Sequence, residues 1–385
     1  MSDPSGRLPQ ALSCSYQMMK IPLPTSRLNF QSPKLVMVGA RIISAYFHPS
    51  YDFATLRTYN EIDQEGIMSE LKSKISIIGC GNVGMRYAYA LIMNGMARNR
   101  VLVDVDQERV EGEVMDLVHA AAFVSPVDIL AGGYEDIGGS DLVVITAGKG
   151  QAKGQSRLEL TKTNVNIFKK IIPQIMKYSP DSIILVVSNP VDILSYAAYK
   201  LSGKPSKQVI GSGTTLDTAR LKSEIAKHCQ LNAKNIHAYI LGEHGDSEVA
   251  IWSRAMVGGI LFKDYCPVCK RAEECNFGQD LKYIFKNVSH SAYEIIKRKG
   301  ETSYGIGLAL ADITRAVLNN QNSILPVSTL NPRYLGLEDV YFSLPAVINE
   351  TGIREVLKLK LSPSEEESLK ESALKLKGII KETGL

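Results

Sequence analysis

A glycine-rich turn, with the sequence GCGNVG at residues 79–84, constrains the fold of this chain most strongly. It follows a β-branched run at 74–78 and opens a segment with helical spacing. In such a strand–turn–helix unit Gly79 permits the tight turn, Gly81 lets the backbone approach a pyrophosphate, and Gly84 lets helix and strand pack closely. Unpaired amides at the helix N-terminus then face the phosphates. The turn therefore predicts a dinucleotide-binding βαβ unit.

An acidic residue follows the turn at the distance that such a unit needs. Asp104 lies twenty residues after Gly84, at the end of the next hydrophobic run. A carboxylate there accepts hydrogen bonds from the ribose hydroxyls of a bound adenosine, and its charge repels a 2′-phosphate. We therefore expect NAD, and not NADP, as the cofactor. The alternative is a solvated Asp104 with no ligand.

The hydrophobic pattern predicts two domains, which the length of 385 residues also favours. Apolar runs without alternation, typical of parallel strands, occur at 74–79, 100–105, 141–147 and 182–188. Helices are expected at 83–94, 108–117, 158–178 and 191–200. This rhythm predicts an α/β fold, a doubly wound parallel sheet of the Rossmann type, over 68–211.

After Gly211 the pattern changes. Longer helices are predicted at 216–229 and 282–298, and short strands at 237–241, 324–329 and 340–345. Ser362, Pro363 and Glu365 form the start signal of a last helix, with a capping box. We expect residues 212–385 to form an α+β substrate domain with a mixed sheet.

Residues 1–67 differ in composition from the rest. Six of the sixteen prolines precede residue 50, and from Pro4 to Tyr51 there are five basic residues and no acidic one. This suits a disordered leader or an organellar targeting segment, although Asp3 and the early prolines argue against a targeting helix. Met68 as the functional start is another reading. We expect a cytoplasmic protein, with a mitochondrial or other organellar location as the alternative.

Composition and charge exclude several classes of function. The chain is 45% hydrophobic and 22% charged, with a formal charge of +4. It has no basic block that would indicate nucleic acid as the main partner, and no apolar run of membrane-spanning length. The sequence therefore predicts a globular protein that acts on small molecules.

Three of the six cysteines cluster as Cys266, Cys269 and Cys275. Zinc would need a fourth ligand, and the nearest histidine downstream is His290, with a predicted helix between. We therefore expect free thiols in a surface connection, and no metal.

Four later residues have the chemistry to transfer a proton and hold an anion. His244, in the sequence LGEHGD, is a titratable imidazole in a turn after a strand. Asp217 and Arg220 are three residues apart on one helix and share a face. Arg157 follows a loop with hinge glycines, residues 148–154, that is able to close over a site. The alternatives are a loop histidine and solvated arginines.

The order and spacing of these segments resemble the lactate/malate dehydrogenase superfamily, over roughly Lys74 to the C-terminus. The resemblance implies that His244 exchanges a proton with the substrate, Asp217 orients it, and Arg157 polarises the carbonyl. It further implies substrate contacts from Gln151, Arg157, Asn189, Arg220 and Thr302. The implied NAD contacts are Gly79, Gly81, Val83, Gly84, Asp104, Arg109, Tyr134, Gly148, Lys149, Val187, Asn189 and Ser212. The Asn189–Pro190 bond is a candidate cis peptide.

Gln151 distinguishes the two branches of the family. The family carries Gln at this lid position in its lactate dehydrogenases and Arg in its malate dehydrogenases, so Gln would leave a second substrate carboxylate unpaired. Thr302 also matches the lactate branch. Two departures are Gln155, where Glu is usual, and Lys149-Gly150 at the base of the lid.

The resemblance thus implies interconversion of pyruvate and L-lactate, as in glycolysis and fermentation. Malate dehydrogenase and a catalytically silent relative are the alternatives. Bacterial members are often homotetramers that bind fructose 1,6-bisphosphate between subunits, and Lys222 and His237 stand at the matching positions. Lys222 keeps the charge but not the bidentate geometry of arginine. The alternative to a regulatory site is a solvated helical lysine and a histidine that starts a strand.

Overall fold

The computed structural model describes residues 73–385 except 151–153, 155 and 270–271, and in addition the backbone of two short strands near the N-terminus. The chain divides into two units, Met1–Ile62 and Asp63–Leu385. In the first unit, β1 (Leu35–Val38) pairs with β2 (Arg41–Ser44) in antiparallel register. This strand pair was not predicted. The rest of the expected leader lies outside the described residues.

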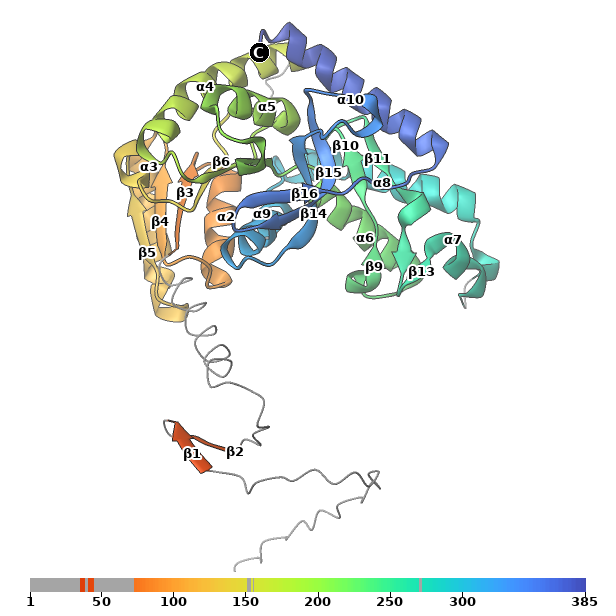
Figure 1. Cartoon of the computed structure of the whole chain (residues 1–385), viewed down its shortest axis with the longest axis horizontal. Helices are drawn as coiled ribbons and strands as arrows, with labels where there is room; N and C mark the ends of the chain where they lie inside the picture. Colours follow the sequence, from red (N-terminus) through yellow and green to blue (C-terminus); the bar gives the residue numbers. More distant parts are fainter. Residues whose placement is uncertain (1–34, 39–40, 45–72, 151–153, 155, 270–271) are drawn as a thin grey trace, which may run out of the picture. The chain divides into compact units, whose positions relative to one another are not determined.

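In the second unit, six parallel strands form the first half of an eleven-stranded sheet (Figure 1). Their order in space is β5-β4-β3-β6-β7-β8. They are β3 (Lys74–Ile78), β4 (Asn99–Val103), β5 (Asp128–Ala131), β6 (Leu142–Ile145), β7 (Ile183–Val186) and β8 (Val209–Gly211). The order reverses at β3 and β6, so the predicted doubly wound sheet is confirmed, with its switch point directly behind the glycine turn.

Helices cover both faces of these strands, as the runs without alternation predicted. α2 (Asn82–Met93), α3 (Gln107–His119) and α9 (Tyr304–Leu318) pack in one apolar core. α4 (Arg157–Tyr178) and α5 (Val191–Ser202) pack in the other. Ser156 caps α4 in a capping box with Glu159, and Gly203 ends α5 in the left-handed conformation.

The second half of the sheet is antiparallel. β8 bonds to β14 through the single pair Gly211 and Ser328, and the sheet continues as β14-β15-β10-β11, with β16 also on β15. These are β10 (Ile240–Gly242), β11 (Glu248–Ala250), β14 (Ser323–Leu330), β15 (Tyr341–Asn349) and β16 (Gly352–Val356). The predicted mixed sheet is confirmed, and it is continuous with the parallel one.

One predicted strand, 237–241, is wrong as a single element. It is two strands in two sheets: β9 (Ile236–His237) pairs with β12 (Met256–Val257), which pairs with β13 (Ile260–Leu261), whereas β10 lies in the large sheet. Ala238 and Tyr239 join them, and Ala238 is buried. An apolar run five residues long does not reveal that the chain changes sheets within it.

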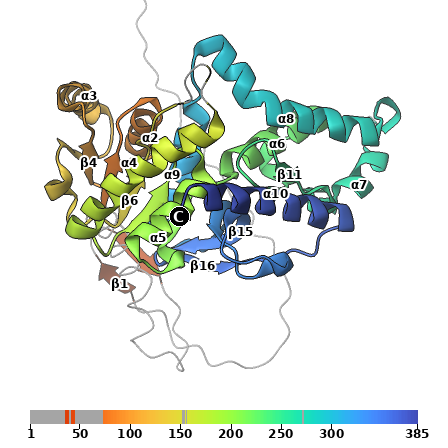
Figure 2. The same ribbon diagram turned by 90° about the horizontal axis from the view of Figure 1, so that it is seen from above.

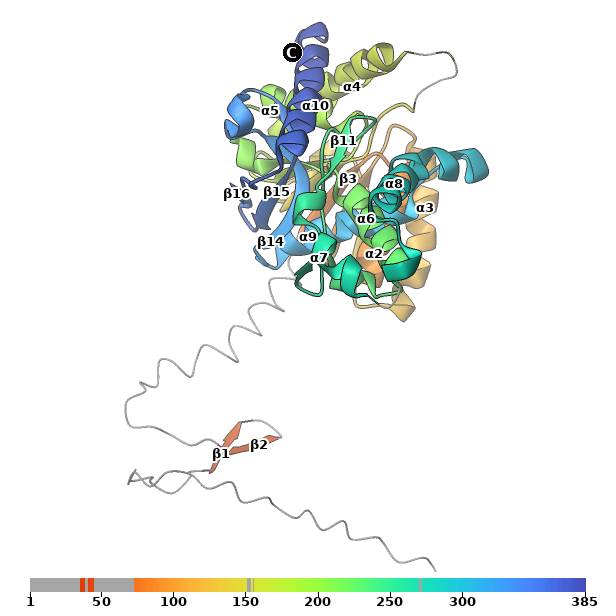
Figure 3. The same cartoon turned by 90° about the vertical axis from the view of Figure 1, so that its right-hand side faces the viewer.

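The remaining helices enclose the substrate side. α6 (Thr215–Cys229), α7 (Phe262–Tyr265) and α8 (Phe277–Lys299) share a core with Leu221, Ile225 and Ile284, and Figure 3 shows α8 alongside α6. α10 (Pro363–Glu382) has the predicted capping box of Ser362 and Glu365. It lies beside α5 near the C-terminus (Figure 2). In the described part of the chain, no helix is both long and apolar enough to cross a membrane.

Candidate active site

The glycine turn after β3 is built by close contacts of backbone. Gly79 has φ +103°, and a Cβ there would lie 2.4 Å from the Ala147 nitrogen. A Cβ on Gly84 would lie 2.1 Å from the Gly79 carbonyl oxygen. Gly81, in contrast, has no heavy atom within 4 Å of its would-be Cβ. The turn therefore presents open space in front of the α2 N-terminus, which fits a phosphate of a dinucleotide.

Asp104 lies at the end of β4 and faces this turn. Its Oδ2 accepts a hydrogen bond of 2.6 Å from the Cys80 amide, and its Oδ1 accepts one of 3.2 Å from the Asp106 amide. Burial and then the charge of Asp104 raise the pKa of Tyr134, which places the phenol near that carboxylate. Arg109, one turn into α3, is exposed and lies 3.6 Å from Glu113. Asp104 thus lies at one end of the turn.

A buried asparagine on α4 ties together the loops that follow β6 and β7. The Asn164 Oδ1 accepts from the Lys149 amide at 2.9 Å. Its Nδ2 donates to the carbonyls of Lys149 at 3.1 Å and Asn189 at 2.7 Å. The sequence reasoning missed Asn164. An amide on the apolar face of a predicted helix was the available signal, because such a group must find partners inside the protein.

The other predicted cofactor residues occupy the same edge of the sheet. Gly148 and Lys149 follow β6 and are exposed, Val187 is a buried residue directly after β7, and Ser212 is buried after β8. Val83 lies in the first turn of α2. The Asn189–Pro190 bond is cis, as predicted.

His244, Asp217 and Arg220 form one connected group. The Asp217 Oδ2 lies 2.6 Å from the His244 Nδ1, and the Asp217 Oδ1 accepts from the Arg220 Nη1 at 2.8 Å. The Asp217 side chain is 5% exposed, that of Arg220 14% and that of His244 25%. The carboxylate is therefore shielded, while the imidazole and the guanidinium still reach the cavity.

The position of the His244 backbone is fixed by a second buried carboxylate, Asp192, in the first turn of α5. Its Oδ2 accepts from the His244 amide at 2.8 Å, and its Oδ1 accepts from the Ser328 hydroxyl at 2.6 Å. Burial raises the pKa of Asp192 to about 6, against the lowering effect of these two bonds. The sequence analysis assigned no role to Asp192.

The carboxylates around His244 determine its charge. Burial alone would lower the pKa of this imidazole, but the charge of Asp217 and its hydrogen bond outweigh burial, and the pKa rises to about 9. Asp192 and Glu248 act in the same direction. With Nδ1 engaged by Asp217, the proton available for exchange is the one on Nε2.

A cavity of about 260 Å³ lies beside His244 and Asp217. Arg157, Asn189, Asp217, Arg220 and His244 are all at its surface, so the structure brings these predicted residues together. α8 supplies an apolar wall through Val288, Ala292 and Ile296, and α10 contributes Ile379.

Arg157 is held at the cavity by groups that the sequence analysis did not consider. Its Nη2 lies 2.5 Å from the Asp246 Oδ2 and donates to the Tyr293 hydroxyl at 3.1 Å. The Tyr293 hydroxyl in turn donates to the Asp246 Oδ1 at 2.7 Å. Arg157 and Asp246 are both about half exposed, so this arrangement is open to water.

Glu248 is a further acidic group that the sequence analysis missed. It is 8% exposed, lines the cavity, and its Oε1 has no hydrogen-bond partner among the described residues. Burial and then the charge of Asp217 raise the pKa of Glu248 to about 8. The site therefore contains a carboxyl group that is largely protonated at neutral pH.

Three of the predicted residues do not line this cavity, and a fourth is outside the part of the chain that the structure describes. Gln151 is outside the described residues. Thr302 is half-buried just before α9 and does not line the cavity. Lys222, half-buried on α6, and His237, exposed on β9, lie on elements that pack through Leu221 and Ile236.

Comparisons with known proteins match this arrangement. Two family models, the lactate/malate dehydrogenase NAD binding domain and its alpha/beta C-terminal domain, match residues 73–211 and 214–384. L-lactate dehydrogenase of Clostridium botulinum is 49% identical over 308 residues, 80% of this chain and 96% of the relative. L-lactate dehydrogenase 1 of Clostridium acetobutylicum is 46% identical over 307 residues, 79% of this chain and 96% of the relative.

Two solved structures are similar as well. The minor L-lactate dehydrogenase of Enterococcus mundtii has a TM-score of 0.78 and 41% identity, and covers 81% of this chain and 98% of its own. A lactate dehydrogenase from a Medee basin deep-sea metagenome library has a TM-score of 0.79 and 46% identity, and covers 82% and 100%.

Proposed function

The chain belongs to the lactate/malate dehydrogenase family, and from this premise we propose that it is an NAD-dependent L-lactate dehydrogenase. It interconverts pyruvate and L-lactate. The observation that carries the proposal is the group of His244, Asp217 and Arg220, which gathers at one cavity. A proton donor and an anion holder side by side suit a 2-oxo acid, whose carbonyl lies next to its carboxylate.

The cofactor is held by the edge of the parallel sheet. Gly81 and the α2 N-terminus receive the pyrophosphate, Asp104 the adenosine ribose, and the loops that Asn164 ties together the nicotinamide side. When bound, NADH supplies the hydride that reduces the carbonyl carbon. The charge of Asp104 repels a 2′-phosphate, which favours NAD.

His244 handles the proton. In reduction its Nε2 donates to the carbonyl oxygen as that oxygen gains charge, and in lactate oxidation the same nitrogen takes the proton back. Asp217 holds the ring through Nδ1 and stabilises the imidazolium, while Asp192 fixes the backbone of the turn.

Two guanidiniums bind the rest of the substrate. Arg220 gives one N–H to Asp217 and presents its remaining donors to the cavity, where they hold the carboxylate. Arg157 polarises the carbonyl oxygen, and Asn189 donates to it. Closure of the loop that precedes Arg157, which the glycines of residues 148–154 predict, would exclude water from the site.

The specificity for pyruvate is assigned to Gln151. A neutral amide at this position would leave the second carboxylate of oxaloacetate unpaired, which costs several kcal/mol. The test is a steady-state assay of NADH oxidation with pyruvate and with oxaloacetate, repeated on Gln151→Arg. We expect pyruvate preference in the original enzyme and a shift of about 10²-fold or more towards oxaloacetate in the variant.

The same assay separates the competing functions. Preference for oxaloacetate in the unmodified chain would favour malate dehydrogenase, and the absence of turnover with either acid would favour a silent relative. An unchanged pyruvate preference in Gln151→Arg would remove Gln151 as the selector while leaving the activity in place.

A homotetramer with a regulatory bisphosphate site is the finer part of the proposal. Lys222 and His237 lie on packed elements, and two copies of the pair across an interface would provide four cationic groups for two phosphates. Burial lowers the pKa of Lys222, and the negative charge of a bound phosphate would raise it.

The regulatory part is tested by pyruvate saturation with and without the bisphosphate, and by the double variant Lys222→Ala, His237→Ala. We expect a lower apparent pyruvate requirement with the effector, lost in the double variant. Identical curves for the unmodified enzyme would remove the regulation, and sedimentation would test the tetramer independently.

We further propose that the enzyme acts in the cytoplasm. The alternative is an organellar location. It rests on residues 1–67, which carry no acidic group between Pro4 and Tyr51, a composition shared by leaders and targeting segments. Fluorescent fusions of the full chain and of residues 68–385 test this. An organellar signal only with the full chain would support targeting instead.

A further inference from the structure

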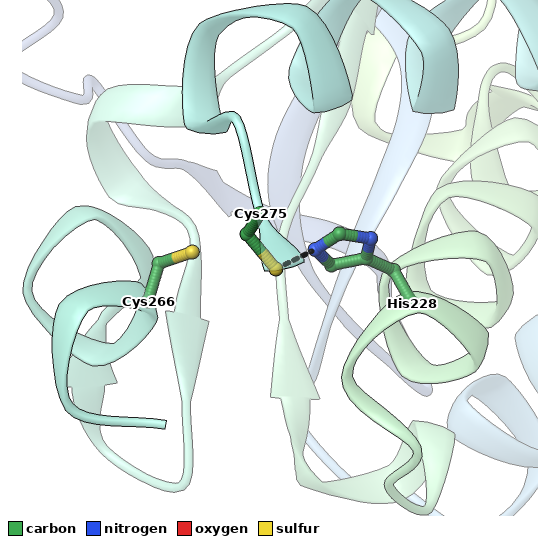
Figure 4. Close-up of side chains that lie close together, drawn as sticks. All are labelled: His228, Cys266 and Cys275. Carbon is green, nitrogen blue, oxygen red and sulfur yellow. Dashed lines mark hydrogen bonds between the residues drawn. The ribbon is translucent and has the colours of Figure 1, made fainter. Parts of the chain in front are cut away.

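Three potential metal ligands meet at the end of α6 that is opposite the active site. They are His228 in the last turn of α6, Cys266 directly after α7, and Cys275 two residues before α8. Their Nε2 and Sγ atoms all lie within 4.8 Å of one another, and the thiols and the imidazole point towards a common space (Figure 4). The three residues come from three elements, so this proximity is a product of the tertiary fold.

The distances fit a tetrahedral metal better than the alternatives. With Zn–S near 2.3 Å and Zn–N near 2.0–2.1 Å, the edges of a tetrahedral site are about 3.6–3.8 Å. The Cys275 Sγ is 3.5 Å from the His228 Nε2, and the remaining edges need to close by about 1 Å at most. A disulfide requires a sulfur separation near 2.05 Å, and Cys266 and Cys275 are both free cysteines.

The donor set selects the kind of metal. Two thiolates and an imidazole are soft to borderline ligands, which favour zinc, whereas magnesium and calcium require oxygen ligands. Cys266 is buried and Cys275 is partly buried, so an ion held there would be largely shielded from water. These features are typical of a closed structural zinc site.

Cys269 is the candidate for the fourth ligand. It lies three residues after Cys266, the spacing of many paired zinc ligands. It would add a third thiolate to the two thiols and the imidazole that the fold brings together.

We propose that His228, Cys266, Cys269 and Cys275 bind one Zn²⁺, which ties the C-terminal end of α6 to the segment between α7 and α8. This replaces our expectation of free thiols. The histidine considered from sequence, His290, is exposed on α8, where its Nδ1 bonds to Ser289 and the Lys286 carbonyl. The correct histidine precedes the cysteines in sequence, and only the fold reveals it.

The role of the ion is structural. α6 carries Asp217 near its start and His228 eleven residues later, roughly 16 Å along the helix, so the ion does not touch substrate. The ion would fix two short 3-10 turns, Cys266–Val268 and Ala272–Glu274, in which Cys266 alone is buried. On binding, the thiols release their protons to solvent and the thiolates coordinate the ion.

The test uses the tag-free full-length protein, purified under reducing conditions. Zinc content is measured by mass spectrometry of the elements, and Co²⁺ is exchanged in to detect thiolate-to-metal charge-transfer absorption. The variants are His228→Asn and the double Cys266→Ser, Cys275→Ser, with His290→Asn as the matched control. We expect about one zinc per chain in the unmodified protein and the control, and about tenfold less in the variants.

Thermal unfolding of the unmodified protein supplies a readout that does not depend on the variants folding. A strong chelator should lower Tm, and Zn²⁺ should restore it, while magnesium should not. The proposal is overturned if the reduced protein neither retains nor binds zinc, or if His228→Asn binds it as well as His290→Asn. An intact mass two hydrogens lighter, with zinc absent, would establish a Cys266–Cys275 disulfide instead and would also overturn it.

Discussion

The cofactor half and the substrate half of the active site are built in different ways. At the cofactor half, main-chain atoms determine the shape of the site. Gly79 and Gly84 allow backbone contacts that a single Cβ would break, and Gly81 leaves open space. At the substrate half, side chains from separate elements converge, with Asp192 from α5, Asp217 from α6 and His244 from the loop after β10.

The difference shows which forces control each half. Steric contacts at the glycine turn are short-range and all-or-none, so the geometry follows once β3 and α2 pack. At the substrate half, buried charges stabilise one another, and each group sets the protonation of its neighbours. The two halves should therefore fail in different ways when single residues are changed.

The largest expected effect separates the halves by chemistry. His244→Asn should lower kcat/KM for pyruvate by about 10³–10⁴-fold, because the proton donor on Nε2 is lost. The affinity for NADH, measured by fluorescence titration, should stay within about twofold, since His244 belongs to the substrate half. Retained turnover at neutral pH would contradict the role of His244 as acid and base.

The second prediction separates the halves by sterics and uses two glycines of one turn. In Gly84→Ala the new Cβ meets the Gly79 carbonyl at 2.1 Å, so the folded state should lose about 1–3 kcal/mol, seen as a lower Tm without nucleotide. In Gly81→Ala nothing lies within 4 Å, and φ is −73°, which alanine adopts freely. Its Tm should be unchanged.

For NADH affinity, in contrast to Tm, the informative variant of this pair is Gly81→Ala. Gly81→Ala should weaken NADH about tenfold or more, because the methyl group occupies the space in front of the phosphate. If Gly81→Ala binds NADH as the unmodified enzyme does, the open space at Gly81 is not the pyrophosphate site.

The same contrast explains what the sequence could predict. The glycine turn, the parallel strands and Asp104 are local patterns with fixed spacing, and the structure has them as expected. The family pattern also identified His244, Asp217 and Arg220, which the fold brings together. Asn164 and Asp192 were missed, because they have partners 15 and 136 residues away in sequence. Glu248 was missed because no local pattern marks a buried polar group. His228 was missed for the same reason.

The third prediction concerns pH and tests the charges of the substrate half. The folded-state pKa of His244 is raised from 6.5 to about 9. Its charged form therefore stabilises the fold fully below pH 6.5, and this contribution is lost as pH rises through about 9. Pyruvate reduction needs the protonated ring, so its kcat/KM should be level to about pH 8 and fall about tenfold per unit above 9.

The control for this profile is Asp217→Asn, which removes the main cause of the raised pKa. The midpoint should move down by more than one pH unit, and the remaining activity should be lower at neutral pH. A profile that keeps its midpoint in Asp217→Asn would show that Asp217 does not set the charge of His244. NADH affinity should be independent of pH over the same range.

The smallest expected effect concerns Glu248, the buried carboxyl group with an unpaired Oε1. Its folded-state pKa is raised from 4.5 to about 8, so it contributes stability that is fully present below pH 4.5 and is lost as pH rises through about 8. Glu248→Gln replaces the neutral acid with a neutral amide of the same shape. At pH 6.5 its kcat/KM should therefore stay within about threefold of the original.

The pH dependence of Tm then distinguishes the neutral from the ionised form of Glu248. The Tm of Glu248→Gln relative to the unmodified protein should rise between about pH 4.5 and 8 and then level off, because in this range Glu248 ionises in the unfolded chain but stays neutral in the folded one. Glu243→Gln is the matched control. Glu243 already accepts a hydrogen bond from Ser247 and pairs with Lys375 at 2.8 Å, so the relative Tm of this variant should not rise in the same pH range. If Glu248→Gln instead lost tenfold in kcat/KM at pH 6.5, Glu248 would be a working carboxylate, and the substrate half would hold one more negative charge than its geometry indicates.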